Sequence, residues 1–359
     1  MRIATVVGAR PQFIKCAPLS KELRQRHEEI LIHTGQHYDY EMSRVFFEEL
    51  DIPEPNYDLG VGSGNHGLQT GKILIALEEV LLKEKPDLAL VFGDTNSTLA
   101  GALAAAKIGI PVAHIEAGLR SFDRSMPEET NRVLTDHISE LLFAPTRTAV
   151  LNLRAEGISK GVHRSGDVMV DSLEAMKRTA LRRSKILERL GVEAERYSVM
   201  TVHRASSTES PENMKKIIAA IGKGGLRTIF PIHPRTRKVL QEAGIMSRLP
   251  DNLTIIEPLG YLDMLMLMTN ARSIITDSGG MQKEAFIVGV RCITLRTNTE
   301  WNETLVEGRN RLVGLDAKMI VEALTLPPLK GAPRVHPFGM PGAAGRIVRA
   351  LDSWYEGAH

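Results

Sequence analysis

Three carboxylates, Asp94, Glu116 and Glu128, stand where the predicted elements would expose them to a ligand. Asp94 and Glu116 each follow a short apolar run, residues 88–92 and 112–115, that predicts a buried strand. Glu128 lies in the first turn of a predicted helix. Ligands bind at the carboxyl ends of parallel strands, so we expect the three carboxylates to meet at one sheet edge as acid and base groups.

The alternative interpretation of these acids is structural. Asp94 and Glu128 would then cap helices, and Glu116 would pair with Arg120 or Arg132. Three acids with interleaved arginines on ligand-side loops favour chemistry over this alternative.

A second group of polar residues lies in the later half of the chain. Residues 273–284 predict a strand, then Ser278-Gly279-Gly280, then a helix. Small residues at a helix N-terminus leave backbone amides open to a pyrophosphate. Glu284, about one and a half turns into that helix, could accept both hydroxyls of a ribose, or it could be a solvated side chain on a capped helix. Other predicted strands end at the same edge with His203, Arg204 and His233.

The first predicted strand runs into a turn that carries two cations, Arg10 and Lys15. A helix N-terminus with cations suits a diphosphate, although Arg10 could instead pair with Asp94 or Glu116. The turn contains one glycine, Gly8, and lacks the G-x-G-x-x-G fingerprint, so a bound nicotinamide cofactor is not expected.

Composition limits the class of protein. A chain of 359 residues predicts two domains, and 43% hydrophobic with 25% charged residues is typical of a globular protein. The 45 basic and 43 acidic residues nearly balance and form no basic block, so a nucleic-acid partner is not expected.

The two cysteines, Cys16 and Cys292, lack the spacing of metal ligands and favour a reducing, cytoplasmic location. His114-Ile115-Glu116 matches the H-x-E of zinc deaminases, but no Pro-Cys-x-x-Cys follows it, and we expect no metal. No run of about 20 apolar residues predicts a membrane span.

The order of predicted elements indicates two α/β domains. Strands are expected at residues 3–7, 30–34, 88–92, 112–115 and 141–144, and again at 198–202, 228–231, 253–256, 273–276 and 292–295. The helices that alternate with them include one at residues 40–50 and a last one at residues 342–354. This alternation predicts two Rossmann-like, doubly wound domains with a ligand cleft between their sheet edges.

Glycines and a pause in periodicity at residues 161–168 predict the linker between the domains. We therefore expect a first domain at residues 1–167, on the sugar and acid–base side, and a nucleotide-binding domain at residues 168–340. Residues 341–359 would form a helix that crosses back to the first domain.

Several motifs together resemble the non-hydrolysing UDP-N-acetylglucosamine 2-epimerase family. They occur in order between residue 2 and about residue 314, and jointly they are specific: Gly8-Ala-Arg-Pro11, Thr34-Gly-Gln-His37, Gly93-Asp-Thr-Asn-Ser-Thr98, His114-Ile-Glu-Ala-Gly-Leu-Arg120, Pro127-Glu-Glu-Thr-Asn-Arg132, His203-Arg204, Asp277-Ser-Gly-Gly-Met-Gln282 and Thr299-Glu300. The resemblance implies a GT-B-type fold, a homodimer, no cofactor, and inversion of C2 of a UDP-sugar through elimination and re-addition of UDP.

The resemblance also implies roles for individual residues. Asp94, Glu116 and Glu128 would be the acid–base set, with His203, Arg10 and Lys15 on the leaving group. The UDP cradle would consist of Ser278, Gly279, Gly280 and Glu284, and the other expected substrate contacts are Arg132, Arg204 and His233.

Some features depart from many family members. The short loop at residues 121–126 and Thr299-Glu-Trp301 resemble the branch that acts on UDP-2,3-diacetamido-glucuronate, so either UDP-sugar is a candidate substrate. In that branch, the loop from Arg120 to Met126, with Arg120 and Arg124, would recognise the substituents at C3 and C6. Asp39 and Leu68 replace residues of the family's allosteric pocket, so a second, activating site is expected to be missing. The rival functions are a GT-B glycosyltransferase and a non-catalytic UDP-sugar sensor.

Overall fold

The computed structural model describes residues 1–36, 52–208, 210–329, 331 and 333–358, apart from the side chains of residues 10, 205, 206 and 358. The chain divides into two compact units. The first comprises Met1–Glu174 with His336–His359, and the second comprises Ala175–Val335. The helix predicted at residues 40–50 lies outside the described residues.

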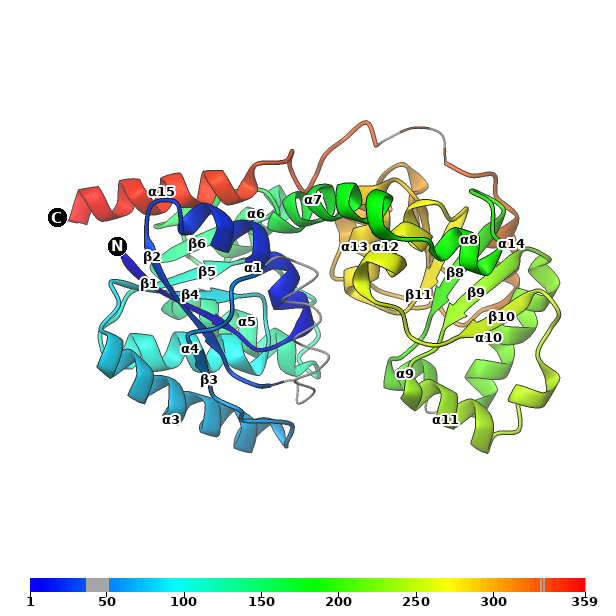
Figure 1. The fold of residues 1–359 in the computed structure, drawn as a ribbon, viewed down its shortest axis with the longest axis horizontal. Helices are drawn as coiled ribbons and strands as arrows, with labels where there is room; N and C mark the ends of the chain where they lie inside the picture. The colour runs from blue at the N-terminus through cyan, green and yellow to red at the C-terminus, as the bar shows by residue number, and fades with distance from the viewer. Residues whose placement is uncertain (37–51, 209, 330, 332, 359) are drawn as a thin grey trace. The chain divides into compact units, whose positions relative to one another are not determined.

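The first unit contains a seven-stranded sheet in which all the strands are parallel (Figure 1). Its order is β3-β2-β1-β4-β5-β6-β7, which is the Rossmann order with one further strand. The strands are β1 (Arg2–Val7), β2 (Glu28–His33), β3 (Tyr57–Asp58), β4 (Leu88–Phe92), β5 (Val112–Ile115), β6 (Leu141–Ala144) and β7 (Val162–Arg164).

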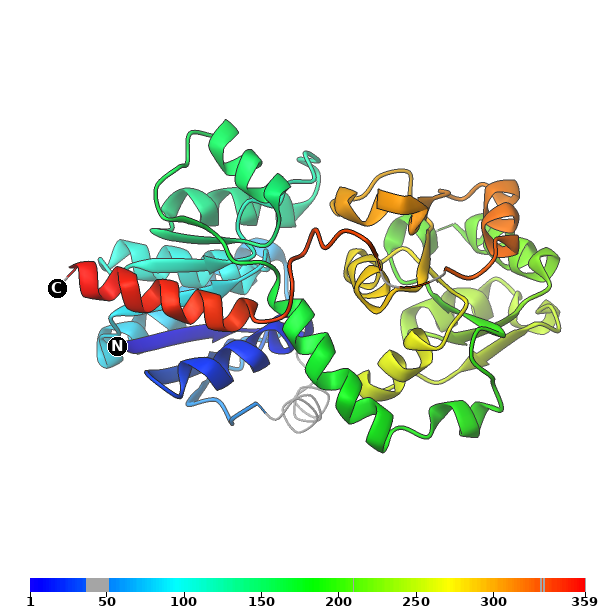
Figure 2. The same ribbon diagram turned by 90° about the horizontal axis from the view of Figure 1, so that it is seen from above.

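Helices cover both faces of this sheet, because its central strands are apolar on both sides. On one face, α3 packs against α4 and α4 against α5; on the other, α15 packs against α1 (Figures 1 and 2). The C-terminal segment thus belongs to the first unit. The helices are α1 (Arg10–Leu23), α3 (His66–Glu84), α4 (Asn96–Lys107), α5 (Pro127–Ile138), α6 (Arg147–Ala155), the first part of α7 (Val168–Arg183) and α15 (Ala343–Ala358).

The second unit contains a six-stranded parallel sheet in the order β10-β9-β8-β11-β12-β13. Alternate residues of its strands enter two separate cores, Met200 and Ile275 on one face and Val199 and Ile274 on the other. The strands are β8 (Tyr197–Thr201), β9 (Arg227–Pro231), β10 (Leu253–Ile256), β11 (Ser273–Thr276), β12 (Arg291–Thr294) and β13 (Asn310–Leu312).

The two cores of the second unit are covered by different helices. One core receives α10 (Pro211–Gly224), α11 (Pro234–Glu242) and α14 (Ala317–Thr325), and the other receives α8 (Ile186–Leu190), α12 (Tyr261–Thr269) and α13 (Gly279–Val288). The short helices α9 (Ala205–Thr208), η1 (Met246–Arg248) and η2 (Asn302–Gly308) complete the unit. The predicted fold class, two doubly wound α/β units, is confirmed.

The predicted linker at residues 161–168 is wrong. Residues Val162–Arg164 form β7, which pairs with β6, because the edge of the sheet accepts a short polar strand with little apolar periodicity. The units divide after Glu174, within α7, and after Val335, whereas the sequence placed the boundaries after residues 167 and 340.

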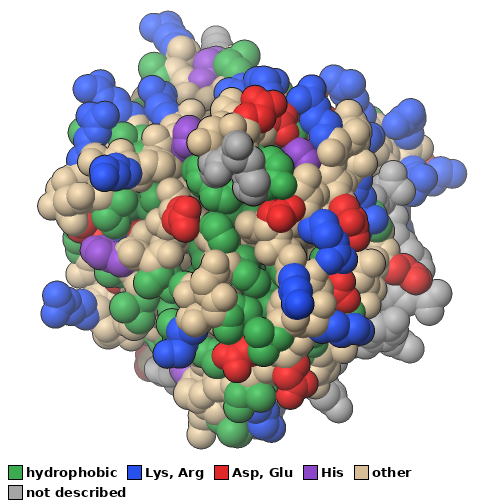
Figure 3. Space-filling model, turned by 90° about the vertical axis from the view of Figure 1, so that its left-hand side faces the viewer, with side chains coloured by type: hydrophobic (Ala, Val, Ile, Leu, Met, Phe, Trp, Pro, Cys, Tyr) green, Lys and Arg blue, Asp and Glu red, His purple; other side chains and the backbone are tan. Residues whose placement is uncertain are grey.

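Hydrophobic side chains gather on the face of the molecule that carries both chain termini, with acidic and basic side chains around them (Figure 3). Helix α3 contributes three exposed large hydrophobic residues to the surface of the first unit: Leu68, Ile75 and Leu82.

Candidate functional site

Each sheet has one point at which the strand order reverses direction along the chain. In the first unit this point lies between β1 and β4, and in the second unit it lies between β8 and β11. Ligands of doubly wound folds bind beyond the carboxyl ends of the strands at such points.

At the end of β1 the chain turns sharply into α1. Gly8 is required here, because a Cβ atom would lie 2.0 Å from Thr34 Oγ1 and 2.3 Å from Ser97 Oγ. The amides of Gly8 and Ala9 both donate to Gln12 Oε1, at 2.8 and 3.0 Å. These two amides are therefore already satisfied within the protein. The side chain of Arg10 lies outside the described residues.

Glu116 and Lys15 form a buried ion pair at the end of β5. Glu116 has a backbone φ of +77°, which is uncommon for a residue with a side chain and persists only where its surroundings hold it. A Cβ atom added at Gly93 would lie 3.4 Å from Glu116 Oε2 and 3.6 Å from Lys15 Nζ. The Glu116 carboxylate is thus placed over the turn that leads to Asp94.

Asp94 forms an ion pair with Arg132 of α5. The Asn131 side chain donates to the Asp94 backbone carbonyl at 2.9 Å. Arg132 also contacts Glu129 at 3.1 Å. The first switch point therefore brings together the predicted residues Asp94, Glu116, Lys15 and Arg132.

Glu128 and Glu129 differ in their surroundings. Glu128 is exposed, whereas Glu129 is buried and accepts from the amides of Ser121 and Phe122, both at 2.9 Å. The sequence prediction named Glu128 and missed Glu129. Both follow Pro127, and only the packing of α5 decides which one points inward.

The loop after β5 departs from one expectation. Arg120 is buried and donates to Asp136 at 2.7 Å and to Glu156 at 2.6 and 2.7 Å. The expectation that Arg120 recognises the sugar is therefore wrong, because its guanidinium is used inside the first unit. Arg124, in the same loop, is exposed.

In the second unit, Asp277 organises the end of β11. It is completely buried, and its carboxylate accepts from the amides of His203, at 3.1 Å, and Arg204, at 2.9 Å. The His203 Nδ1 atom lies 3.5 Å from Asp277 Oδ1. The structure thus brings predicted residues His203 and Arg204 to the turn that contains Ser278.

Ser278 caps α13, with its side chain accepting from the Met281 amide. A Cβ atom at Gly279 would lie 2.0 Å from Glu300 Oε1, whereas at Gly280 it would meet only Ser278 Oγ, at 3.9 Å. The start of this ten-residue helix is therefore open at Gly280, as an approaching anion requires.

Glu300 is a residue that the sequence prediction did not assign. It lies against Gly279 and contacts Arg296 at 2.8 Å and Arg204 at 3.7 Å. Burial raises the pKa of Glu300. The charges of Arg296 and Arg204, together with hydrogen bonds, lower it by a larger amount, so the pKa of Glu300 lies below its usual range. Its occurrence in Thr299-Glu300 was the available signal.

Two more predicted residues lie in the second unit. Glu284 is buried on α13 and accepts from the Tyr261 hydroxyl at 3.3 Å. His233 caps α11, and its Nδ1 accepts from the Arg235 amide at 3.2 Å. Burial, followed by the charges of His203 and Arg235, lowers the pKa of His233, so this ring is neutral near pH 7.

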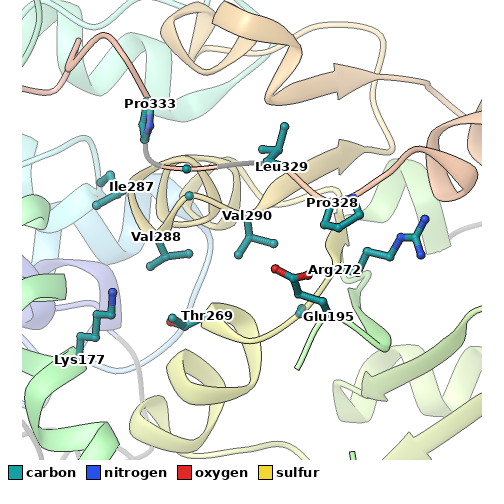
Figure 4. A pocket seen from close by; sticks show the side chains of 13 residues that line it. Lys177, Glu195, Thr269, Arg272, Ile287, Val288, Val290, Pro328, Leu329 and Pro333 are labelled. Atoms are coloured by element: carbon teal, nitrogen blue, oxygen red, sulfur yellow. The ribbon is translucent and has the colours of Figure 1, made fainter. Parts of the chain in front are cut away.

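Two cavities differ in their relation to these residues. One of about 360 Å³ in the first unit is lined by His66, Asn96, Pro127 and Asn131, next to the Asp94 turn. Another of about 340 Å³ in the second unit lies where β11 and β12 begin, away from Ser278 (Figure 4). Its lining combines apolar residues such as Val288 and Val290 with the charged residues Lys177, Glu195 and Arg272, and it contains none of the predicted site residues.

In the described part of the chain, no group of three or more His, Cys, Asp or Glu side chains could hold a metal ion. Nor is any helix among the described residues long and apolar enough to cross a membrane.

Comparison with known proteins identifies relatives over nearly the whole chain. The family model for UDP-N-acetylglucosamine 2-epimerase matches residues 21–352. A UDP-N-acetylglucosamine 2-epimerase homolog of Methanococcus maripaludis is 57% identical over 328 residues, which cover 90% of this chain and 92% of the relative. The UDP-2,3-diacetamido-2,3-dideoxy-D-glucuronate 2-epimerase of Pseudomonas aeruginosa is 46% identical over 331 residues, covering 90% and 91%.

A solved structure gives the same result. The crystal structure of UDP-GlcNAc 2-epimerase from Methanocaldococcus jannaschii, in complex with UDP-GlcNAc and UDP, is 46% identical and has a TM-score of 0.90. The match covers 98% of this chain and 100% of that one. The motifs, the two switch-point sites and these matches show that the chain belongs to the UDP-N-acetylglucosamine 2-epimerase family.

Proposed function

We propose that this protein is a cofactor-independent epimerase that inverts C2 of a UDP-N-acetylhexosamine, converting UDP-GlcNAc to UDP-ManNAc. The observation that carries the proposal is the buried carboxylate Glu116, held with Lys15 beside the Asp94 turn at the first switch point. The open N-terminus of α13 at Gly280 and membership of the family support it.

The reaction proceeds by elimination because C2 has no adjacent carbonyl to acidify its proton. A carboxylate removes the C2 proton, the C1–C2 double bond forms, and the C1–O bond breaks so that UDP departs with the electron pair. UDP then adds back to C1 of the glycal while a proton is delivered to the opposite face of C2. This scheme needs acid–base groups at the sugar and cations or amides at the diphosphate.

We assign the steps to the predicted residues. Asp94, Glu116 and Glu128 form the acid–base set, and Arg10, Lys15 and His203 contact the departing diphosphate. The UDP moiety is bound by Ser278, Gly279, Gly280 and Glu284, with Arg132, Arg204 and His233 as further substrate contacts. The Lys15–Glu116 and Arg132–Asp94 pairs support this assignment, because each places a cation beside an acid–base candidate.

Incubation with UDP-GlcNAc in deuterated water, followed by proton NMR, tests the mechanism. Deuterium at C2 of the product is expected, because the removed proton exchanges with solvent before its return. An unlabelled epimer would overturn the elimination mechanism, and transfer of the sugar to an acceptor would favour the glycosyltransferase. Binding of the nucleotide sugar without turnover would favour the sensor.

UDP-2,3-diacetamido-glucuronate is the second candidate substrate, and the Pseudomonas relative at 46% identity favours it. The buried Glu129 carboxylate accepts hydrogen bonds from the backbone of the loop at residues 121–126. Arg124 of this loop is exposed and able to pair with a uronate carboxylate. Comparison of kcat/KM for the two sugars in wild type and Arg124→Ala tests this. A uronate preference that the substitution abolishes supports the second candidate; strong UDP-GlcNAc turnover in both proteins excludes it.

We also propose that the protein is a homodimer that pairs through α3. Leu68, Ile75 and Leu82, which are 58%, 62% and 55% exposed, recur every seven residues and so share one side of the helix. In an antiparallel pair with its two-fold axis at Ile75, Leu68 lies opposite the partner's Leu82, and Lys72 lies opposite the partner's Glu78. The two-fold axis therefore pairs apolar residues with apolar residues and a lysine with a glutamate.

Light scattering after gel filtration tests the dimer. Ile75→Glu should yield a monomer, whereas Leu181→Glu, a substitution at an exposed position of α7, should leave the dimer intact. Ile75→Cys should form a disulfide between copies, because the axis brings this residue against itself and both native cysteines are buried. A dimer that survives Ile75→Glu would refute this interface.

We further propose a cytoplasmic location for the protein, because Cys16 and Cys292 are free thiols, which are typical of a reducing compartment.

A further inference from the structure

His114, on β5, is completely buried and has a partner at both ring nitrogens. Its Nδ1 lies 2.7 Å from Asp136 Oδ1, and its Nε2 lies 2.7 Å from the Gly93 carbonyl oxygen. A carbonyl oxygen can only accept a hydrogen bond, so Nε2 carries a proton. The protonation of Nδ1 then depends on the state of Asp136.

Asp136, on α5, is an ionised carboxylate. Its Oδ2 atom accepts from the Gly118 amide at 3.0 Å and from Arg120 at 2.7 Å. Burial raises the pKa of Asp136, but the charges and hydrogen bonds of His114 and Arg120 outweigh burial and lower it below its usual range. An ionised carboxylate has no proton to donate, so Nδ1 of His114 must donate to Asp136 Oδ1. With both ring nitrogens protonated, the ring is an imidazolium.

The charges in this cluster balance. Arg120 is also buried and donates through Nε and Nη2 to the Glu156 carboxylate, at 2.6 and 2.7 Å. Two cations, His114 and Arg120, thus face two carboxylates, Asp136 and Glu156. Removing one member of such a buried set leaves an uncompensated charge, which destabilises the folded state.

The cluster connects the elements that carry the acid–base candidates. His114 bonds the carbonyl of Gly93, the residue before Asp94. Asp136 bonds the amide of Gly118, two residues after Glu116. Gly118 has no room for a side chain, because a Cβ atom would lie 2.3 Å from the Ala149 carbonyl oxygen. Both turns are thereby fixed to α5.

We propose that His114 is an imidazolium and that His114 and Asp136 are positioning residues, which set the placement of Asp94 and Glu116 for the reaction. The inference rests on the proposed function for its kinetic part only. Hydrogen bonds from a charged donor are stronger than neutral ones, so the imidazolium holds the Gly93–Asp94 peptide more rigidly than a neutral ring would. A histidine that only fills the core would need one protonated nitrogen.

Nitrogen NMR of the full chain labelled at histidine tests the charge, with the His114 signals assigned by their loss in His114→Gln. Both ring nitrogens should be protonated, because each faces an oxygen that accepts a hydrogen bond. An unprotonated Nδ1 would overturn the imidazolium. This readout does not depend on turnover, so it stands even if the wild type epimerises no nucleotide sugar.

Asp136→Asn tests positioning with little change of shape. The amide nitrogen can donate to Nδ1 of a neutral His114, while its oxygen still accepts from Gly118 and Arg120. We expect kcat to fall by about ten- to a hundredfold, the loss that a misplaced catalytic group produces, with KM changed by less than about threefold. Leu134→Gln, at an exposed position of the same helix, is the matched control and should leave both constants unchanged.

His114→Gln is the second variant and should show the same loss of kcat. If it fails to fold, Asp136→Asn decides, with its Tm measured to show that it is folded at the assay temperature. Unchanged kcat in folded Asp136→Asn, or a loss confined to KM, would overturn the positioning role.

Discussion

The two switch points share one topology but use their backbone amides in opposite ways. In the first unit, the amides of Gly8 and Ala9 are taken by Gln12, and the edge is lined by paired charges. In the second unit, Asp277 accepts from the amides of His203 and Arg204, and the start of α13 is open at Gly280.

The difference shows how one fold supports two tasks. An edge whose turn amides are satisfied internally is free to present side chains for acid–base chemistry. An edge at which a helix N-terminus is open to solvent, as α13 is at Gly280, can bind an anion through its backbone amides. We therefore expect substitutions in the first unit to change turnover and substitutions in the second unit to change nucleotide affinity.

The largest expected effect is on turnover. Asp94→Asn, Glu116→Gln and Glu128→Gln should each lower kcat by at least about a hundredfold, the usual scale for acid–base groups. UDP affinity, measured by calorimetry, should stay the same because the proposed nucleotide cradle lies in the other unit. Glu129→Gln is the informative comparison for Glu128, since Glu129 is buried with the loop. Near-normal rates in two folded variants would return those residues to a structural role.

The next effect is on stability. Lys15→Met should lower the free energy of unfolding by about 3–5 kcal/mol, because it breaks the buried ion pair with the Glu116 carboxylate. Lys21→Met, at an exposed lysine of the same helix, is the control and should have little effect. Urea unfolding measures both. Adding Glu116→Gln to Lys15→Met should restore part of the loss; strict additivity would argue against a coupled pair.

A smaller effect is expected on nucleotide affinity. Gly280→Ala should weaken UDP binding by about tenfold, because the added methyl group obstructs the approach to the helix amides while little else is disturbed. Gly67→Ala places the same methyl group in the first turn of α3, where nothing lies within 4 Å. Calorimetry with UDP compares the two. Equal affinities in both variants would show that UDP does not approach Gly280.

The smallest expected effect is on acid stability. Burial lowers the pKa of His33 on β2, and the neighbouring Asp58 offsets this only in part. As pH falls below about 6.5, the unfolded chain binds the proton first, so His33 favours unfolding, and this loss continues down to its folded pKa. The drop in Tm between pH 7.5 and 5.5 should be smaller in His33→Gln than in wild type or His137→Gln. An equal drop would assign the acid sensitivity elsewhere.

Much of the fold could be predicted because its signals are local. The apolar runs at β1, β4 and β5 are buried on both faces, so each is continuous in sequence and recognisable as a parallel strand. The Ser278-Gly279-Gly280 turn is likewise a local signal, since only small residues fit it. The edge strand β7 was missed because an edge strand needs no apolar run.

Which carboxylates face inward was decided only by tertiary structure. Glu128 and Glu129 are adjacent, and their different burial depends on how α5 packs, a property that no local pattern encodes. Arg120 points inward because it pairs with Glu156. These two residues are 36 positions apart in the sequence, so no local pattern reveals the pair. His114 contacts Asp136, 22 residues later, and Glu300 reaches Gly279 from a separate loop. The sequence by itself determined most of the elements and the residue types at the two sheet edges. The long-range packing decided each residue's partner, because a buried charge is stable only where the fold brings its counter-charge.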